Sequence, residues 1–162
     1  MTGDRIRFMT HVLGDGGRVG IGGPGRNIAG LRRAAREALR ALEIGAMLGQ
    51  TARAHRYADL AILDLVGVGS ADAEAFMRGV LGPLATTGAS RTYLETLRLL
   101  SANGYRIKLT AAALSIHPHT LSYRVKQIRR RFGIDLDEPD VRLRVHLALL
   151  ILGAQGPTSD AT

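Results

Sequence analysis

The sequence predicts a mainly α-helical protein, in which a C-terminal helix-turn-helix bundle follows a small α+β segment made of a hairpin and a helix. The first reason is composition: aromatic residues make up 4% of the chain and Trp is absent. The core must then be built from Leu, Ala, Val and Ile, which favours helices. The second reason is that apolar residues recur at helical spacing through several segments. The length of 162 residues suggests one domain, or a small domain with a fragment of another.

The N-terminal segment contains the expected hairpin. Residues 5–13 partly alternate between apolar and polar side chains, residues 18–22 form a second short run, and Asp15-Gly16 stands between them, which is a hairpin signal. The run Gly20–Gly25 matches the spacing G-x-G-x-x-G, which can cradle a phosphate in front of a helix. We favour the alternative, a Gly-rich exit from a strand, because Pro24 removes one amide donor and no buried parallel strand is evident upstream.

A long helix is expected from Asn27 to Leu48, with Asn27 as its N-cap. We expect its basic residues to be solvated. Its buried stripe is predicted to be Ile28, Leu31, Ala35, Ala38, Leu42 and Ala46.

Two shorter elements follow this helix. Residues 55–65 suggest a short strand or turn and then a short helix. Residues 72–81 suggest a helix that ends at Gly82-Pro83, since Pro cannot continue a helix. The inward side chains of that second helix are predicted to be Phe76, Val80 and Leu81.

The expected domain limits follow from these breaks. We predict an α+β segment over residues 1–84, a linker over 85–90, a helical domain over 91–153 and a disordered tail over 154–162.

The helical domain begins with a support helix that Ser90 caps and that Asn103-Gly104 ends. Its inward side chains are predicted to be Leu94, Leu97 and either Leu99 or Leu100. Its last helix follows Asp137-Glu-Pro139, reaches about Leu152 and is apolar on two sides. That helix therefore suits either the core or a dimer interface. Its two faces are Val141, Val145, Ala148 and Leu152, and Leu143, Leu147 and Leu150.

Between these helices lies a predicted helix-turn-helix. Residues 110–114 form a short Ala-rich helix and Ser115–His117 the turn. Pro118 opens the second helix, where its missing N–H costs little, and Gly133 ends that helix after Phe132. The apolar stripe of the second helix is Leu121, Val125, Ile128 and Phe132, at i, i+4, i+7 and i+11.

The other side of this second helix is polar and basic. From Arg91 to Arg131 the chain carries nine Lys or Arg residues and one acid, Glu95, so the positive charge is concentrated here. A solvated basic face is the simplest explanation, but these side chains also suit a helix in the DNA major groove. The candidate DNA-contacting residues are His117, His119, Thr120, Ser122, Tyr123, Arg124, Lys126, Arg129, Arg130 and Arg131.

Some of these residues have further interpretations. His117 is a plausible N-cap whose ring nitrogen accepts from a backbone N–H. His117 and His119 form an H-x-H pair, which is weak evidence for a metal because further ligands are missing. Arg129 to Arg131 suit phosphate contacts, and Arg131 could instead pair with Asp135 or Asp137.

The spacing of these residues resembles the C-terminal DNA-binding domain of PucR/CdaR-type bacterial transcriptional regulators. The resemblance rests on Leu94-Glu-Thr-Leu97, Thr110–Leu114, Ile116-His117-x-x-Thr120-Leu121-x-Tyr123-Arg124-Val125 and Gly133-Ile-Asp135-Leu136. It implies a helix-turn-helix fold and DNA binding. The family usually has Asn or Asp before the Thr-Leu pair, and His119 stands here.

An upstream part of the chain resembles the GGDEF-like domain that precedes the DNA-binding domain in many such regulators. The matching residues are Val19–Gly22, Gly30-Leu31 and Glu37-Ala38-x-x-Ala41-Leu42. The acidic GGDEF-type signature is absent, so the resemblance does not imply cyclic dinucleotide synthesis. Because family members carry upstream sensory domains, we expect the chain to be a fragment, a truncated form or a degraded gene product.

The composition bears on the remaining function classes. The chain has no Cys, which excludes disulfides and Cys-based zinc sites and fits a cytoplasmic protein. No G-x-S-x-G is present and the acids are scattered, so we expect no enzyme, no cofactor and no metal. We also expect no membrane contact, because the first ten residues lack an apolar core and the longest apolar run is too short to span a bilayer.

Three functions are open at this point. The first is a sequence-specific regulator, or its DNA-binding fragment, that binds double-stranded DNA as a homodimer through residues 118–132. The second is a non-specific, nucleoid-type DNA-binding protein. The third is a nucleotide-binding or dimerisation module that uses Gly20–Gly25.

Overall fold

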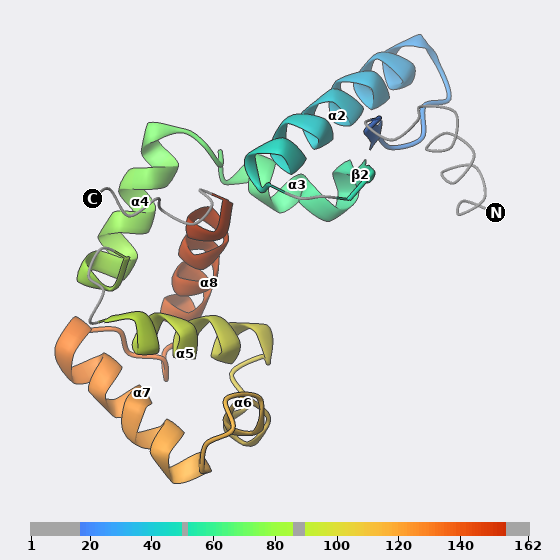
Figure 1. Ribbon diagram of the computed structural model, residues 1–162. Coiled ribbons are helices and arrows are strands. Elements are labelled where there is room, and N and C mark those ends of the chain that lie inside the picture. Colours follow the sequence, from blue (N-terminus) through green and yellow to red (C-terminus); the bar gives the residue numbers. More distant parts are fainter. Residues whose placement is uncertain (1–16, 50–51, 86–89, 155–162) are drawn as a thin grey trace. The chain divides into compact units, whose positions relative to one another are not determined.

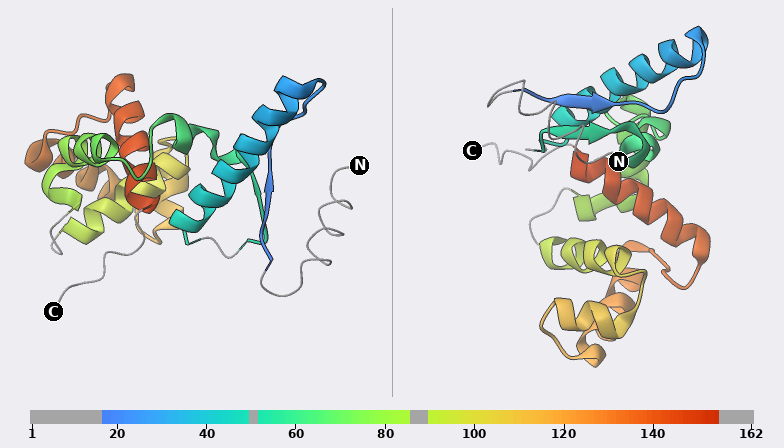
Figure 2. Two further views of the ribbon diagram at one scale, coloured as in Figure 1. Left: turned by 90° about the horizontal axis from the view of Figure 1, so that it is seen from above. Right: turned by 90° about the vertical axis from the view of Figure 1, so that its right-hand side faces the viewer.

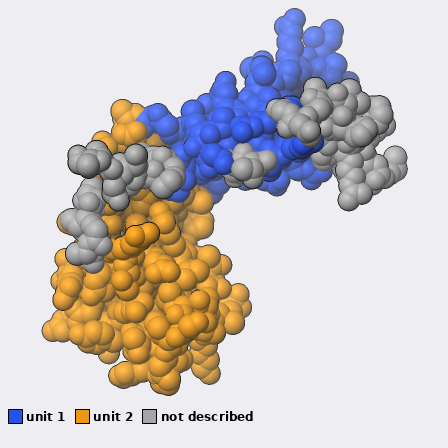
Figure 3. All heavy atoms as spheres, in the orientation of Figure 1, with its two compact units in different colours: residues 1–70, 153–162 blue, residues 71–152 orange. Residues whose placement is uncertain are grey.

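The computed structural model describes residues 17–49, 52–85 and 90–154 (Figure 1). The chain divides into two compact units, residues 1–70 with 153–162 and residues 71–152 (Figure 3). The fold is mainly α-helical with a small α+β part, as the sequence predicts. The expected limits at 85–90 stay a prediction, because 86–89 and 155–162 lie outside the described residues. We note that Leu81 and Leu84, which the sequence assigned to the first domain, are buried within residues 71–152.

The first unit is a β-α-β arrangement. It contains β1 (Val19–Ile21), α2 (Ile28–Met47), β2 (Ala54–Arg56) and α3 (Tyr57–Leu65). The two strands are parallel, with Gly20 opposite His55. The second strand of the expected hairpin is therefore present as β1, and among the described residues its partner is β2. The expected first strand at 5–13 and the Asp15-Gly16 turn lie outside the described residues.

The inward face of α2 differs from the predicted stripe. Asn27 is the N-cap as expected, and its side chain accepts a hydrogen bond from the Gly30 N–H at 2.8 Å. The fully buried residues of α2 are Ala41, Ile44 and Gly45. Of the six residues predicted to be inward, only Ala38 and Leu42 are even partly covered. The other four, Ile28, Leu31, Ala35 and Ala46, are exposed, so this prediction was wrong.

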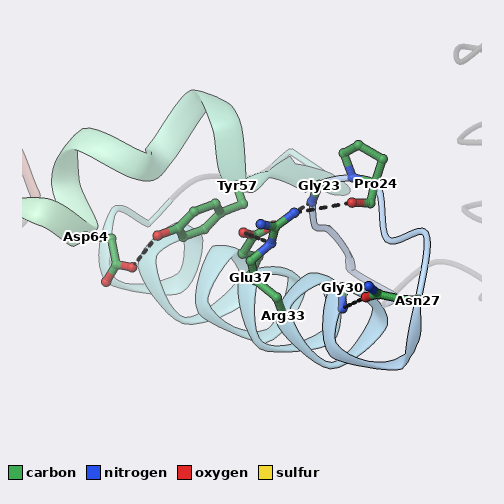
Figure 4. A network of polar contacts seen from close by, with 8 residues as sticks. All are labelled: Gly23, Pro24, Asn27, Gly30, Arg33, Glu37, Tyr57 and Asp64. Carbon is green, nitrogen blue, oxygen red and sulfur yellow. Dashed lines mark hydrogen bonds and ion pairs between the residues drawn. The ribbon is translucent and has the colours of Figure 1, made fainter.

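The glycines of residues 20–25 explain this orientation. A Cβ on Gly20 would lie 2.0 Å from the Ala38 carbonyl oxygen, and one on Gly22 would lie 2.0 Å from the Ala34 carbonyl oxygen. The strand thus approaches the helix more closely than a side chain allows. The Gly23 N–H donates to the Glu37 carboxylate at 2.6 Å (Figure 4). This amide is already occupied by a carboxylate, which favours the Gly-rich strand exit over a phosphate cradle.

Gly22→Ala is expected to lower the free energy of unfolding by at least about 2 kcal/mol, because the added methyl overlaps the α2 backbone. Gly79 is a matched control: it lies in a helix, and a Cβ there meets nothing within 4 Å. Gly79→Ala should therefore raise stability by roughly 0.5–1 kcal/mol. Thermal melting followed by circular dichroism checks both changes, and equal midpoints for the two variants would contradict the close packing.

A small charged network links α2 to α3. Arg40 Nε lies 2.5 Å from Asp64 Oδ1, and the Tyr57 hydroxyl donates to Asp64 Oδ2 at 2.7 Å. Arg40 also pairs with Glu43 at 2.9 Å. The hydrogen bonds from Arg40 and then Tyr57 lower the pKa of Asp64 below its usual value. The same contact with Asp64 raises the pKa of the Arg40 guanidinium and of the Tyr57 hydroxyl.

The lowered pKa of Asp64 makes its contribution to stability depend on pH. The contribution is present above the ordinary carboxyl pKa of 3.8 and is lost as the pH falls through the lower pKa of the folded state. Because the pair is partly exposed, Asp64→Asn should cost only about 0.5–1 kcal/mol at pH 7. Urea unfolding should show that difference shrinking below about pH 4. The same change at exposed Asp59, on the same helix, is the matched control and should alter the free energy of unfolding at pH 7 by less than about 0.5 kcal/mol.

The second unit is a helical bundle. It contains α4 (Ala71–Leu81), the 3-10 turn η1 (Gly82–Ala85), α5 (Arg91–Ala102), α6 (Ile107–Ala113), α7 (Pro118–Phe132) and α8 (Pro139–Ala154). Helix α5 lies between α8 on one side and the pair α6 and α7 on the other (Figure 1, and the right view of Figure 2). Of the three residues predicted to face inward on α4, Leu81 is buried, Val80 is half-buried and Phe76 needs correction. Phe76 is exposed, whereas Ala73 and Met77 are buried, because the buried side of α4 is turned by one residue.

The predicted support helix is present as α5, with one change in its inward residues and one at its N-cap. Leu97 and Leu100 are buried as predicted, Leu94 and Leu99 are half-buried, and Thr96 takes the remaining inward position. Ser90 occupies the N-cap position of α5 as predicted, but its side chain makes no capping hydrogen bond to the helix. At the other end, the Asn103 side chain donates to the Leu99 carbonyl at 2.8 Å.

Polar contacts join α8 to α5 and to the loop that follows α5. Ser101 Oγ lies 2.6 Å from His146 Nδ1, and the Tyr105 hydroxyl donates to the Arg142 carbonyl at 2.9 Å. The Arg142 guanidinium stacks 5.2 Å from the centre of the Tyr105 ring, and burial raises the pKa of that hydroxyl. Val145 and Ala148 are fully buried, so this face of α8 belongs to the core, whereas Leu143 is exposed.

Candidate nucleic-acid interface

The first helix of the pair, α6, packs through small buried residues. Thr110 and Ala111 are buried, and the Thr110 hydroxyl donates to the Arg106 carbonyl at 3.0 Å. The helix begins at Ile107, three residues before the predicted start, so Lys108 lies in its first turn. Its small buried residues allow close helix packing, as the Ala-rich sequence predicted.

A tight turn joins α6 to α7. Ser115 has a left-handed backbone with φ of 54°. The Ser115 N–H donates to the Ala112 carbonyl and the Ile116 N–H to the Ala111 carbonyl, both at 3.0 Å. These two bonds form the Schellman motif that ends a helix, which usually has Gly at the left-handed position. The turn therefore directs the chain into α7 through backbone hydrogen bonds.

Helix α7 has the bounds that the sequence predicts, Pro118 to Phe132. His117 is its N-cap, and His117 Nδ1 accepts from the His119 N–H at 3.2 Å. This bond is the capping role predicted for His117. Gly133 ends the helix with φ of 69°, and its N–H donates to the Arg129 carbonyl.

The apolar stripe of α7 faces the bundle core. Leu121 and Ile128 are fully buried, and Val125 and Phe132 are half-buried. The Phe132 ring lies edge-on to Tyr93 of α5, with centroids 5.7 Å apart. This contact fixes the rotation of α7, and so decides which of its side chains reach the surface.

Leu121→Ala is expected to destabilise the second unit by about 2–5 kcal/mol, because it leaves a cavity in the core. Tyr123→Ala, two residues further on the exposed side, should change the free energy of unfolding by less than about 0.5 kcal/mol. Chemical denaturation of the two variants measures the contrast, and a large loss in the Tyr123 variant would show that α7 is oriented differently.

The surface of α7 opposite the core carries one exposed row. We call His119, Tyr123, Lys126 and Arg130 the α7 outer row; they recur at i, i+4, i+7 and i+11 and so lie along one line of the helix. Tyr123 is 60% exposed. The helix contains no acidic residue, so this row presents aromatic, hydrogen-bonding and cationic groups without a competing negative charge.

The remaining candidate residues flank this row. Thr120 and Arg131 are exposed and Arg124 is half-buried on one flank. Ser122 and Arg129 lie on the other flank, where the Ser122 hydroxyl donates to the Pro118 carbonyl at 3.0 Å. The structure thus brings all ten candidates onto α7 or its N-cap, on three adjoining sides of one helix.

Two arginines of the Arg129–Arg131 run are engaged within the domain. Arg129 pairs with Asp135 at 2.9 Å and Asp137 at 3.7 Å. The sequence suggested Arg131 for these carboxylates, which was wrong, because residue 129 lies on the side of α7 that meets the following loop. Arg131 instead lies 5.8 Å from the centre of the Tyr93 ring, an aromatic–cation contact.

Two basic residues near the interface were missed as candidates. Arg106 and Lys108 lie at the start of α6, and both are exposed. The charge count over Arg91–Arg131 includes them, but the predicted helix began too late to place them beside a helix N-terminus. Both side chains carry an exposed positive charge, so they suit phosphate contacts.

Neither a metal site nor a membrane span is found in the described part of the chain. There, His, Asp and Glu side chains do not gather in groups of three or more that could hold a metal ion. Each helix within residues 17–49, 52–85 and 90–154 is too short or too polar to cross a bilayer.

The short helix, tight turn and exposed basic helix define a helix-turn-helix domain. Residues 93–151 match the family model of the PucR C-terminal helix-turn-helix domain, and residues 4–44 match that of the GGDEF-like domain. Residues 93–151 are therefore similar to the C-terminal helix-turn-helix domain of PucR. Both family resemblances seen in the sequence are confirmed.

The chain is similar to three proteins of known sequence. It is 40% identical over 88 residues to an uncharacterized protein from the pkwA 5' region of Thermomonospora curvata, covering 54% of this chain and 49% of that one. It is 47% identical over 66 residues to the transcriptional activator PmfR of Paenarthrobacter nicotinovorans, covering 40% of this chain and 14% of PmfR.

A third relative is the proline-responsive transcriptional activator PutR of Bacillus subtilis, 36% identical over 64 residues, which cover 40% of this chain and 16% of PutR. The matched part of this chain thus spans half or less of each relative. No solved structure matches the chain.

Proposed function

We propose that this chain is a sequence-specific DNA-binding transcriptional regulator, or the DNA-binding part of one, that inserts α7 into the major groove. The observation that carries the proposal is the α7 outer row, which is exposed along the whole helix while the opposite stripe holds α7 in the core. An α-helix fits the major groove, and the residues along one exposed line can meet base edges and phosphates together. The relatives named as transcriptional activators support it.

The proposed contacts divide by chemistry. Arg124 and Lys126 have the reach to meet guanine O6 and N7, whereas Tyr123 and Thr120 suit phosphate or sugar. His119 stands where the family usually has Asn or Asp, and its exposed ring can donate to a base edge. Arg106 and Lys108 at the start of α6 add phosphate contacts on the neighbouring helix.

The pairing of the arginines favours a specific over a nucleoid-type function. A non-specific binder depends on free positive charge against phosphates. In this domain Arg129 is partly neutralised by Asp135 and Asp137, and Arg131 stacks on Tyr93. Of the run of three, Arg130 alone belongs to the α7 outer row, so the row offers mixed side-chain types rather than a block of charge.

Arg124→Ala combined with Lys126→Ala is expected to weaken binding to the preferred duplex by roughly 10-fold or more, since each base contact contributes about 1–3 kcal/mol. A matched control is Arg78→Ala with Arg144→Ala, which removes the same charge from α4 and α8. Fluorescence anisotropy with a duplex selected from a random pool measures both. Equal binding of the two double variants, with unchanged circular dichroism, would refute the role of α7.

Competition with random duplex separates the specific from the nucleoid-type function. A specific regulator prefers its selected duplex by at least about 1,000-fold, whereas a ratio near one indicates a non-specific binder. For both functions the logarithm of the affinity falls as the logarithm of the salt concentration rises, so the ratio decides between them.

We further propose that two copies act together. One helix-turn-helix covers a single half-site, and two-fold related half-sites one turn of DNA apart call for two domains. We place this activity in the cytoplasm, where bacterial DNA is found, and we assign the chain a binding role without catalysis.

A further inference from the structure

Helix α2 carries an exposed apolar row along its whole length. We call Ile28, Leu31, Ala35, Leu39 and Ala46 the α2 outer row; the half-buried Leu42 lies on the same line. Ile28, Leu31 and Leu39 are 73%, 60% and 62% exposed. A single exposed leucine is ordinary, but a continuous apolar row on a helix of about 30 Å marks an interaction surface.

The other faces of α2 are already in use within the first unit. Gly20 and Gly22 bring β1 against Ala38 and Ala34, so any strand that lengthens this sheet would lie beside β1 and β2, on that face. Helix α3 covers a further flank, where Arg40 meets Asp64. The α2 outer row lies away from both of these contacts.

The charged residues beside the row can pair with the same residues of a second copy. Arg32 and Arg36 border its N-terminal half, and Glu43 borders the same side of its C-terminal half. The Glu43 carboxylate pairs with Arg40 of its own helix at 2.9 Å, and its side chain is still 59% exposed to a second partner. When two such helices pack antiparallel, this charged side of one helix lies along the same side of the other, running in the opposite direction. Arg32 then faces Glu43 of the second copy, and the pair occurs twice because of the two-fold symmetry. In a parallel arrangement opposite sides of the two helices would meet, so Arg32 would not reach Glu43 of the second copy.

We propose that the α2 outer row is the surface on which a second copy of this chain docks, with the two α2 helices antiparallel. The docking removes the row of both copies from water, and the Arg32–Glu43 pairs set the direction. The inference locates the dimer of the proposed function, yet it is separable from DNA contact, because it uses the first unit and the α7 outer row lies in the second.

Leu31→Glu with Leu39→Glu tests the surface in the full chain by sedimentation equilibrium. The unchanged protein should have twice the 17.3 kDa mass of one chain. The double variant should be monomeric, with a dimer dissociation constant raised by roughly 100-fold or more. In the unchanged dimer four leucines, two from each copy, are removed from water, and the glutamates abolish that gain. Leu65→Glu is the matched control, because Leu65 is 86% exposed on α3 and lies off the row, so this variant should stay dimeric.

A charge exchange tests the direction without touching the apolar row. Arg32→Glu and Glu43→Arg should each raise the dimer dissociation constant by roughly 3- to 10-fold, and their combination should restore most of the loss. Restoration shows that the two residues meet across the dimer. If the double exchange is no better than the single changes, the antiparallel arrangement is wrong.

The outcomes also separate this inference from DNA binding. The Leu31/Leu39 variant should bind a single half-site as well as the unchanged protein, and the Arg124/Lys126 variant should dimerise normally. A monomeric unchanged protein overturns the inference, and so does a dimer that persists in the Leu31/Leu39 variant, which would place association on another surface. Failure of DNA binding alone would refute the proposed function and leave the dimer surface standing.

Discussion

The burial of Leu121 and Ile128 is the constraint on which the exposed surface of α7 depends. These two side chains hold α7 against the bundle at one rotation, and the Phe132–Tyr93 contact secures its far end. Once that rotation is set, the helical period alone decides that His119, Tyr123, Lys126 and Arg130 point outward. The chemistry of the outer surface is therefore positioned by apolar packing on its opposite side, and no loop has to be ordered to present it.

Local chemistry explains why α7 could be predicted from the sequence to the residue. Pro118 suits the first position of a helix, His117 supplies a capping nitrogen and Gly133 adopts the left-handed backbone that ends it. Each signal acts within a few residues, so it can be recognised without knowing the rest of the fold. The family resemblance of the helix-turn-helix rests on the same short-range spacing.

Tertiary contacts explain where the predictions failed. Helix α2 has small or apolar residues on most of its circumference, so the period alone does not say which face is buried. The choice was made by Gly20 and Gly22, whose missing side chains admit β1 against Ala34 and Ala38. Likewise, the partner of Asp135 depends on where the loop after Gly133 meets α7, which selected Arg129 over Arg131. The direct roles of the ten candidate DNA contacts remain predictions.

The contact between glycines and helix has a further consequence for the isolated chain. It sets the rotation of α2 by the absence of side chains, and this forces the larger residues Ile28, Leu31 and Leu39 into water. The native monomer therefore contains a local conflict between close backbone packing and burial of apolar surface. If two copies associate through this row as proposed, the conflict is relieved in the dimer, and the stability of the folded chain then depends on its concentration. The amount of the protein in the cell would then influence the stability of its folded state.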